Sequence, residues 1–138
     1  MSNADLFQKV KDLNLPIGEY ALFGSAPMGI RGLKECSDVD LLVTDGIWKK
    51  YDGQPGWEYK YLDDNRVALE NKAISIEMAT SWWPGEWDCQ KIIQEAEIIN
   101  GLPFVRLETV LKWKKIVARE KDLKDVETIE KFLHTRSN

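Results

Sequence analysis

Two aspartates, Asp38 and Asp40, stand two residues apart at the start of the apolar, β-branched stretch Val39 to Thr44. Because side chains two positions apart on a β-strand project from the same face, the two carboxylates would share one small volume. Carboxylate oxygens at this spacing suit Mg²⁺, which takes water and substrate phosphate oxygens as its other ligands. The pair therefore predicts a Mg²⁺ site that acts on a phosphate-bearing substrate.

A Gly-Ser pair, Gly24 and Ser25, ends the apolar stretch Glu19 to Phe23 that precedes the aspartates in the chain. Glycine lets another group approach the backbone closely. Ser25 adds a hydroxyl and an amide at the start of a following short helix, where anions are favoured. We expect this turn to hold phosphate groups beside the two carboxylates.

A third carboxylate, Glu77, lies on a later predicted strand, Ala73 to Met78. The alternation along this strand places its two isoleucines and Met78 on one face and Glu77 on the other. A carboxylate displayed there would complete the metal site. A solvent-facing glutamate on an edge strand would show the same pattern, and Glu70 is a rival for the role.

The segments Gly24-Ser25 and Ser37-Asp38-Val39-Asp40-Leu41 together resemble the nucleotidyltransferase superfamily that includes DNA polymerase beta. The resemblance is closer to its small bacterial members and to the aminoglycoside nucleotidyltransferases. It implies an enzyme that moves a nucleoside monophosphate from an NTP to an acceptor hydroxyl and releases pyrophosphate, with two Mg²⁺ ions. The roles it implies are triphosphate binding by Gly24, Ser25 and Ser37, and metal binding and catalysis by Asp38, Asp40 and Glu77.

A second, looser part of the resemblance lies near the C-terminus. It matches a Lys…Arg-x-Lys-Asp-x-x-Asp pattern of small family members through Lys114, Arg119, Lys121, Asp122 and Asp125. On a helical wheel Lys114 falls inside an apolar arc, so it either extends to solvent or meets an anion, such as a nucleotide phosphate or a carboxylate. Lys121, Asp122 and Asp125 are expected mainly to cap and solvate the last helix.

The family pattern is broken at Met28, where small members carry an arginine after the Gly-Ser pair. Arg31 or Lys34 would have to supply that charge. The missing arginine leaves a second interpretation open, namely a nucleotidyltransferase-like regulatory module of antitoxin type, with weak or no catalysis, that pairs with a partner protein. A third interpretation is a purely structural α+β domain, against which the combination of the two aspartates with Glu77 speaks.

The elements expected around these residues form an α+β domain: a small mixed β-sheet with an N-terminal helix and C-terminal helices packed beside it. Hydrophobic periodicity predicts an amphipathic helix over Asp5 to Leu13 and a hairpin from Trp57 to Glu70 that turns at Asp63-Asp64-Asn65. Beyond Pro84 the period becomes helical. The expected elements there are a helix from Trp87 to Ile99 closed by Asn100-Gly101 as a left-handed cap, a short extended piece at Leu102 to Val105, and helices over Leu107 to Arg119 and Leu123 to Leu133.

Length and composition favour a single domain over residues 1–138, with a core sheet over about 18–80 and a helical part over about 85–134. The net charge of −4, from 19 basic and 23 acidic residues, provides no field that would attract a nucleic-acid backbone. The two cysteines lack zinc-ligand neighbours, and there is no signal sequence or membrane span, so we expect a cytoplasmic protein with reduced thiols and no membrane partner.

The acceptor stays open among a small molecule, a protein side chain and an RNA end. So small a domain would suit a homodimer or a helical partner protein that completes the acceptor pocket. The cluster Trp82, Trp83 and Trp87 is expected to form core or a subunit contact rather than a stacking platform for a base.

Overall fold

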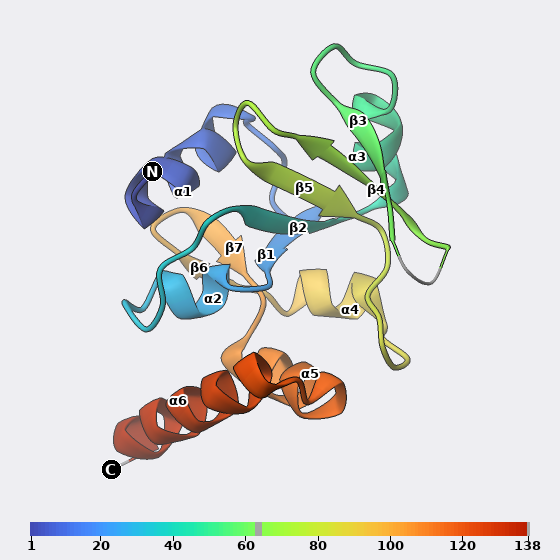
Figure 1. Cartoon of the computed structure of the whole chain (residues 1–138). Helices are drawn as coiled ribbons and strands as arrows, with labels where there is room; N and C mark the ends of the chain where they lie inside the picture. Colours follow the sequence, from blue (N-terminus) through green and yellow to red (C-terminus); the bar gives the residue numbers. More distant parts are fainter. Residues whose placement is uncertain (63–64, 138) are drawn as a thin grey trace.

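A seven-stranded mixed β-sheet runs through the middle of the molecule, with helices on both of its faces (Figure 1). The computed structural model describes residues 1–62 and 65–137. Across the sheet the strands follow the order β3-β4-β5-β2-β1-β7-β6, so β2 is the central strand. The strands are β1 (Tyr20–Phe23), β2 (Val39–Val43), β3 (Glu58–Tyr61), β4 (Val67–Asn71), β5 (Ile76–Ala79), β6 (Glu97–Ile99) and β7 (Leu102–Phe104).

Six helices complete the described part of the chain. The first begins at a capping box, in which the Ser2 hydroxyl accepts from the Asp5 amide at 3.1 Å and the Asp5 carboxylate accepts from the Ser2 amide at 3.2 Å. The helices are α1 (Asn3–Asp12), α2 (Ala26–Gly29), α3 (Asp45–Tyr51), α4 (Cys89–Gln94), α5 (Leu107–Val117) and α6 (Glu120–Ser137).

The three strands at the centre of the sheet set the register of the candidate site. β1 pairs antiparallel with β2, which places Phe23 opposite Asp40. β2 pairs parallel with β5, which places Asp40 opposite Glu77. The short apolar runs of β1 and β2 are almost entirely buried, as expected for strands covered on both faces.

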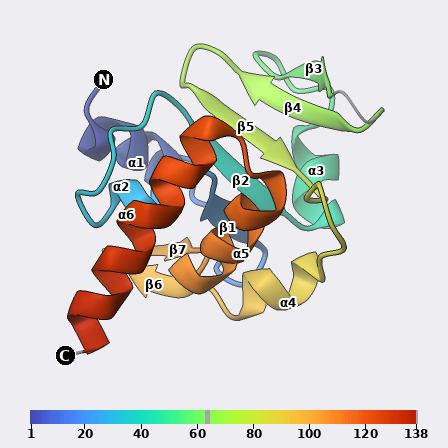
Figure 2. The same ribbon diagram turned by 60° about the horizontal axis from the view of Figure 1, so that its bottom comes forward.

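Two layers of core fill the space on the two sides of the sheet. Alternation along β2 sends Leu41 into the first layer and Leu42 into the second. The first layer includes Leu6 and Val10 of α1 and Ile47 of α3, and the second includes Ile93 of α4, Val110 of α5 and Ile129 of α6. Asp40 shares the side of Leu42 and therefore faces α5 and α6, which pass in front of β1 and β2 in Figure 2.

The expected fold class is confirmed: the structure is α+β, with a mixed sheet, an N-terminal helix and C-terminal helices. The hairpin is confirmed as β3 and β4, and its expected turn falls partly on residues 63–64, outside the described residues. The strand expected over Ala73 to Met78 begins only at Ile76, because Ser75 has a positive φ of 56° in the turn before it. The last helix begins at Glu120, earlier than expected.

The helix expected from Trp87 to Ile99 is wrong. Only Cys89–Gln94 is helical, and Glu97–Ile99 forms β6, which pairs antiparallel with β7. Asn100 and Gly101, expected to cap a helix, form the turn of this β6–β7 hairpin, with φ values of 51° and 82°. Two positive φ angles in succession suit a tight hairpin turn as well as a helix cap, and Asn-Gly favours both.

The β6–β7 hairpin also extends the sheet into the part of the chain that was expected to be helical. β7 joins β1 in parallel through Leu22 and Phe104, so the extended piece expected at Leu102 to Val105 is confirmed as a sheet strand. None of the helices in residues 1–62 and 65–137 combines the length and the apolar character needed to cross a membrane.

Candidate active site

The turn after β1 lies directly against the carboxylate of Asp40. Gly24 has a φ of 66°, and a Cβ built on it would lie 2.4 Å from Asp40 Oδ2. Glycine is needed here both for the left-handed conformation and for the close approach. Ser25 follows as the N-cap of α2 without using its side chain for capping.

The three predicted carboxylates lie along the same region of the sheet. Asp38 is exposed just before β2 begins, and Asp40 is partly buried on β2 itself. Glu77 stands opposite Asp40 on β5. Burial, reinforced by the charges of Glu77 and then Asp38, raises the pKa of Asp40 from 3.8 to about 7, although Lys60 acts in the opposite direction.

The register distinguishes Glu77 from its rival Glu70. Glu70 lies opposite Glu77 on β4 and is therefore one strand farther from Asp40. Lys60 of β3 reaches over this row of carboxylates, and its Nζ lies 2.7 Å from Glu77 Oε1. Glu77 is thus the nearer candidate for a third carboxylate, and it has a lysine as its partner.

Lys114 is buried and meets anions from the last helix, which is one of the two outcomes expected for it. Its Nζ lies 2.9 Å from Asp125 Oδ2 and 3.4 Å from Asp122 Oδ1. Only 6% of the Lys114 side chain is exposed. Burial alone would raise the pKa of Asp122, but the hydrogen bond from Arg119 and the charge of Lys114 outweigh it, so this pKa lies below its usual value.

The expectation that the acidic residues of α6 would mainly be solvated is wrong for two of them. Asp122 is fully buried and Asp125 is 9% exposed. Asp122 does help to cap α6, since it accepts from the Arg119 amide at 3.2 Å and from Arg119 Nε at 2.6 Å. Its second carboxylate oxygen holds Lys114, which ties α5 to α6.

The two proposed substitutes for the missing arginine lie in different places. Lys34 reaches the site, where its Nζ lies 2.7 Å from Asp125 Oδ2. Arg31 points elsewhere, to Glu97 at 2.5 Å and to the carbonyl oxygen of Pro27 at 2.7 Å. Met28 is itself buried in the core.

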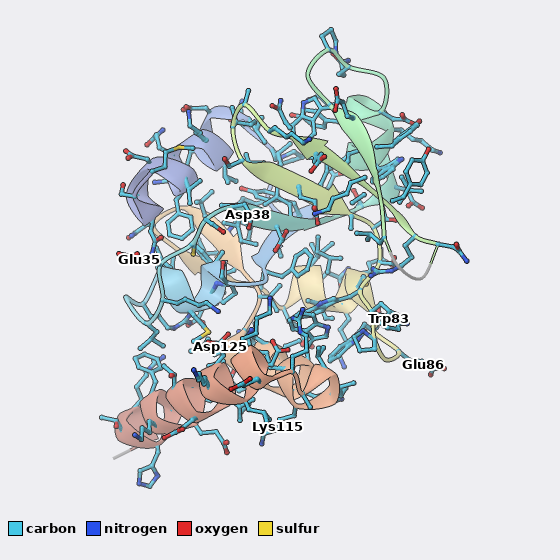
Figure 3. All side chains as sticks on the ribbon, in the orientation of Figure 1. Glu35, Asp38, Trp83, Glu86, Lys115 and Asp125 are labelled. Atoms are coloured by element: carbon cyan, nitrogen blue, oxygen red, sulfur yellow. The ribbon has the colours of Figure 1, made fainter. Side chains whose placement is uncertain are left out.

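A cavity of about 360 Å³ lies between the sheet and the two C-terminal helices. Figure 3 shows Asp38 on the sheet side and Asp125 on α6 across this space, with Lys115 directed away from it. The cavity brings together six of the seven predicted site residues, namely Gly24, Ser25, Ser37, Asp38, Asp40 and Lys114.

The seventh, Glu77, lines an adjoining open cavity of about 230 Å³ together with Lys60 and Glu70. Ser37 and Asp38 line both cavities and mark the point where they meet. Asp38 is therefore accessible from both cavities.

The donor set fits Mg²⁺ in its chemistry. Asp38 and Asp40 supply hard oxygen ligands beside a cavity, and burial together with the charges of Glu77 and Asp38 raises the pKa of Asp40. Within the described ranges, no three His, Cys, Asp or Glu side chains are grouped so that they could hold a metal ion by themselves. Further ligands would have to come from water and from the phosphates of a substrate.

Comparison with known proteins found no match to a protein-family model, to a curated protein or to a solved structure. The chemistry of the site is therefore the basis on which a function is assigned.

Sequence reasoning missed several residues of this region, Lys60 and Trp113 among them. Lys60 could have been found from the alternation of β3, which separates it from the tyrosines on either side, but its reach to Glu77 depends on the register of three strands. Trp113, which lines the cavity next to Lys114, carried only the signal of being its neighbour in the chain.

Proposed function

We propose that this protein is a Mg²⁺-dependent nucleotidyltransferase, which moves a nucleoside monophosphate from an NTP to an acceptor hydroxyl and releases pyrophosphate. One observation carries the proposal: a glycine turn packed against Asp40 faces the ammonium groups of Lys34 and Lys114 across one cavity. Carboxylates for a cation and cations for phosphates thus line the same space, as nucleotide chemistry requires.

The triphosphate would lie between the turn after β1 and the C-terminal helices. The backbone of Gly24 and the amide and hydroxyl of Ser25 would contact phosphate oxygens from the sheet side. Lys34 and Lys114 would contact them from the other side, while Asp125 holds both ammonium groups in place at 2.7 Å and 2.9 Å. These charges would stabilise the negative charge that grows on the leaving pyrophosphate.

Asp38 and Asp40 would hold Mg²⁺, with Glu77 as the third carboxylate. When bound, Mg²⁺ supplies positive charge that lowers the pKa of the acceptor hydroxyl and neutralises the leaving group. Lys60 would have to give up Glu77 for that carboxylate to join the site, since the two now form a 2.7 Å ion pair.

In the chemical step, the acceptor oxygen forms a bond to the α-phosphorus as the bond from that phosphorus to the bridging oxygen breaks. The electron pair of the broken bond leaves with pyrophosphate. The hydroxyl proton passes to a carboxylate, for which Glu77 is the candidate on the side of the second cavity. An in-line displacement needs the acceptor and the leaving group on opposite sides of the phosphorus, so we expect the acceptor in the cavity lined by Glu77 and the pyrophosphate in the cavity lined by Lys114.

The test is thermal unfolding with and without MgCl₂ in the presence of ATP, GTP, CTP or UTP. We expect at least one nucleotide to raise the melting temperature of the wild type only with Mg²⁺. The variant Asp38→Ala/Asp40→Ala should lose this shift. The variant Glu86→Ala/Glu127→Ala, which removes two exposed carboxylates away from the site, should keep it. Absence of any shift in the wild type would contradict the proposal.

A second candidate function is a regulatory module of antitoxin type, with weak or no catalysis. It is favoured by the burial of Met28, because the position that would carry a phosphate-binding arginine is part of the core. In that case the nucleotides would leave the melting temperature unchanged, while a partner protein would bind the wild type and the double aspartate variant equally.

A further inference from the structure

Trp113 stands out in the cavity between the sheet and the C-terminal helices. Among the described residues that line this cavity, it is the one aromatic side chain, and all of the others are glycine, serine or charged. Phosphates and metal ions are bound by charged and polar groups, so the apolar face of an indole ring would not serve either of them. A flat apolar surface in a polar cavity instead matches the flat apolar part of a nucleotide, its base.

The Trp113 ring is held firmly in this position. Its Nε1 donates to the backbone oxygen of Trp83 at 2.9 Å. The ring packs on that of Trp82, with centroids 5.3 Å apart and planes inclined at 32°. Trp82 is buried at 6% exposure and also packs on Trp87, with centroids 4.9 Å apart. A stacking surface fixed before the ligand arrives loses little conformational entropy on binding.

The position of this ring relative to the cations also suits a nucleotide. Lys114 Nζ lies 5.5 Å from the centre of the Trp113 ring, and the same ammonium group is held by Asp125 beside Lys34. A nucleotide carries its triphosphate and its base on one sugar, so a site for it must present a cationic part and a stacking part close together. The cavity does so through two consecutive residues of α5.

We propose that Trp113 is the surface on which the base of the NTP stacks. This inference rests on the proposed nucleotidyltransferase function, and it adds the residue that sets the preference of the site among nucleotide bases. Stacking accepts every base, because every base has a π-face, and it favours the larger ring systems. The site therefore binds all four nucleotides and prefers purines to pyrimidines, and the base adds affinity beyond that of the triphosphate.

The experiment compares the affinities of ATP and of inorganic tripolyphosphate, both with MgCl₂, measured by titration calorimetry. The variants are Trp113→Leu, which keeps an apolar side chain, and Trp113→Phe, which keeps a smaller aromatic ring. Trp87→Phe is the matched control. Like Trp113, Trp87 packs on the ring of Trp82 and donates from Nε1 to a backbone carbonyl oxygen, that of Pro84, at 2.9 Å. Unlike Trp113, it does not line the cavity.

We expect the wild type to bind ATP about tenfold more tightly than tripolyphosphate, and Trp113→Leu to lose this advantage while it still binds tripolyphosphate. Trp113→Phe should keep part of the advantage, and Trp87→Phe all of it. The role of Trp113 is overturned if ATP and tripolyphosphate bind the wild type equally, or if Trp113→Leu and Trp113→Phe both keep the full ratio. If neither compound binds the wild type, the nucleotide site itself is absent and the proposed function falls as well.

Discussion

Gly24 and Asp40 are packed so closely that no side chain fits between them: a Cβ on Gly24 would lie 2.4 Å from Oδ2 and 3.3 Å from Cγ of Asp40. The contact fixes the turn after β1 against β2, at the strand position that carries the partly buried carboxylate. The backbone of the proposed phosphate-binding turn and the proposed metal ligand are therefore positioned by one another.

Gly24→Ala should destabilise the fold by about 3 kcal/mol, since it combines a positive φ of 66° with the clash against Asp40. Gly32→Ala is the matched control, because Gly32 has a φ of 73° but nothing within 4 Å of its added Cβ. We expect about 1 kcal/mol for this control, measured by urea unfolding. Equal losses in the two variants would show that the contact with Asp40 carries no strain.

Asp40→Asn should make the metal-free protein more stable at high pH. Because the folded pKa of about 7 lies above the ordinary 3.8, folded Asp40 keeps a proton that the unfolded chain releases, and stability falls as pH rises through this window. Allowing for the partial exposure of Asp40, we expect a gain of about 2 kcal/mol at pH 8 and less than about 0.5 kcal/mol at pH 4.

The measurement for Asp40→Asn is urea unfolding at the two pH values in EDTA. Asp12→Asn, at an exposed position of α1, is the control and should change stability little at either pH. A gain from Asp40→Asn that is the same at pH 4 and pH 8 would mean that the carboxylate is not held in its protonated form.

Lys114→Met should cost about 3 kcal/mol of stability, because it leaves the buried carboxylates of Asp122 and Asp125 without one of their counter-charges. Its neighbour Lys115 offers a matched control, since that side chain is 53% exposed and its Nζ lies 3.7 Å from an exposed Glu130 carboxylate. Lys115→Met should change stability by less than about 0.5 kcal/mol. Guanidinium unfolding measures the stability of both variants. Similar losses of stability in Lys114→Met and Lys115→Met would contradict the role of Lys114 in the buried ion-pair network.

Lys34→Met should weaken the binding of Mg²⁺ and tripolyphosphate about tenfold, since it removes a cation from the cavity. Arg31→Met should leave that affinity within about twofold, because Arg31 is occupied by Glu97 and the Pro27 carbonyl outside this cavity. Calorimetric titration at two salt concentrations measures the affinity of each variant for Mg²⁺ and tripolyphosphate. A larger loss for Arg31→Met would assign the missing arginine to that position instead.

The sequence was sufficient to predict the elements whose signal is local. The alternation of the β3–β4 hairpin follows from the period of a strand, and the hairpin is found where expected. The two aspartates were expected on one face of a strand; Asp40 is on β2, whereas Asp38 lies just before its first residue. The β6–β7 hairpin was missed because Asn100-Gly101 satisfies a helix cap and a hairpin turn equally. The hairpin is favoured over the helix cap by the pairing of β7 with β1 through Leu22 and Phe104, which is a contact between distant parts of the chain.

The candidate site shows the same division. The Gly24 turn and the two aspartates could be predicted from residue types and spacing, because Gly24 directly follows β1 and the aspartates lie at the start of the neighbouring strand β2. The ion pair of Lys34 with Asp125 and the burial of Asp122 could not be predicted from the sequence. Both depend on how α6 docks against the loop before β2. Periodicity indicates which face of a helix is buried, but it does not say what that face meets.

The 91 residues that separate Lys34 from Asp125 have a consequence for the order in which the molecule acquires its properties. Contacts between such distant residues form late in folding, because a long loop must close first. On the ribosome, the Gly24 turn, Lys34 and the two aspartates emerge before α5 and α6, so the nascent sheet carries its carboxylates without Lys114, which later faces them. The cavity therefore takes its final lining only after α5 and α6 have joined the sheet.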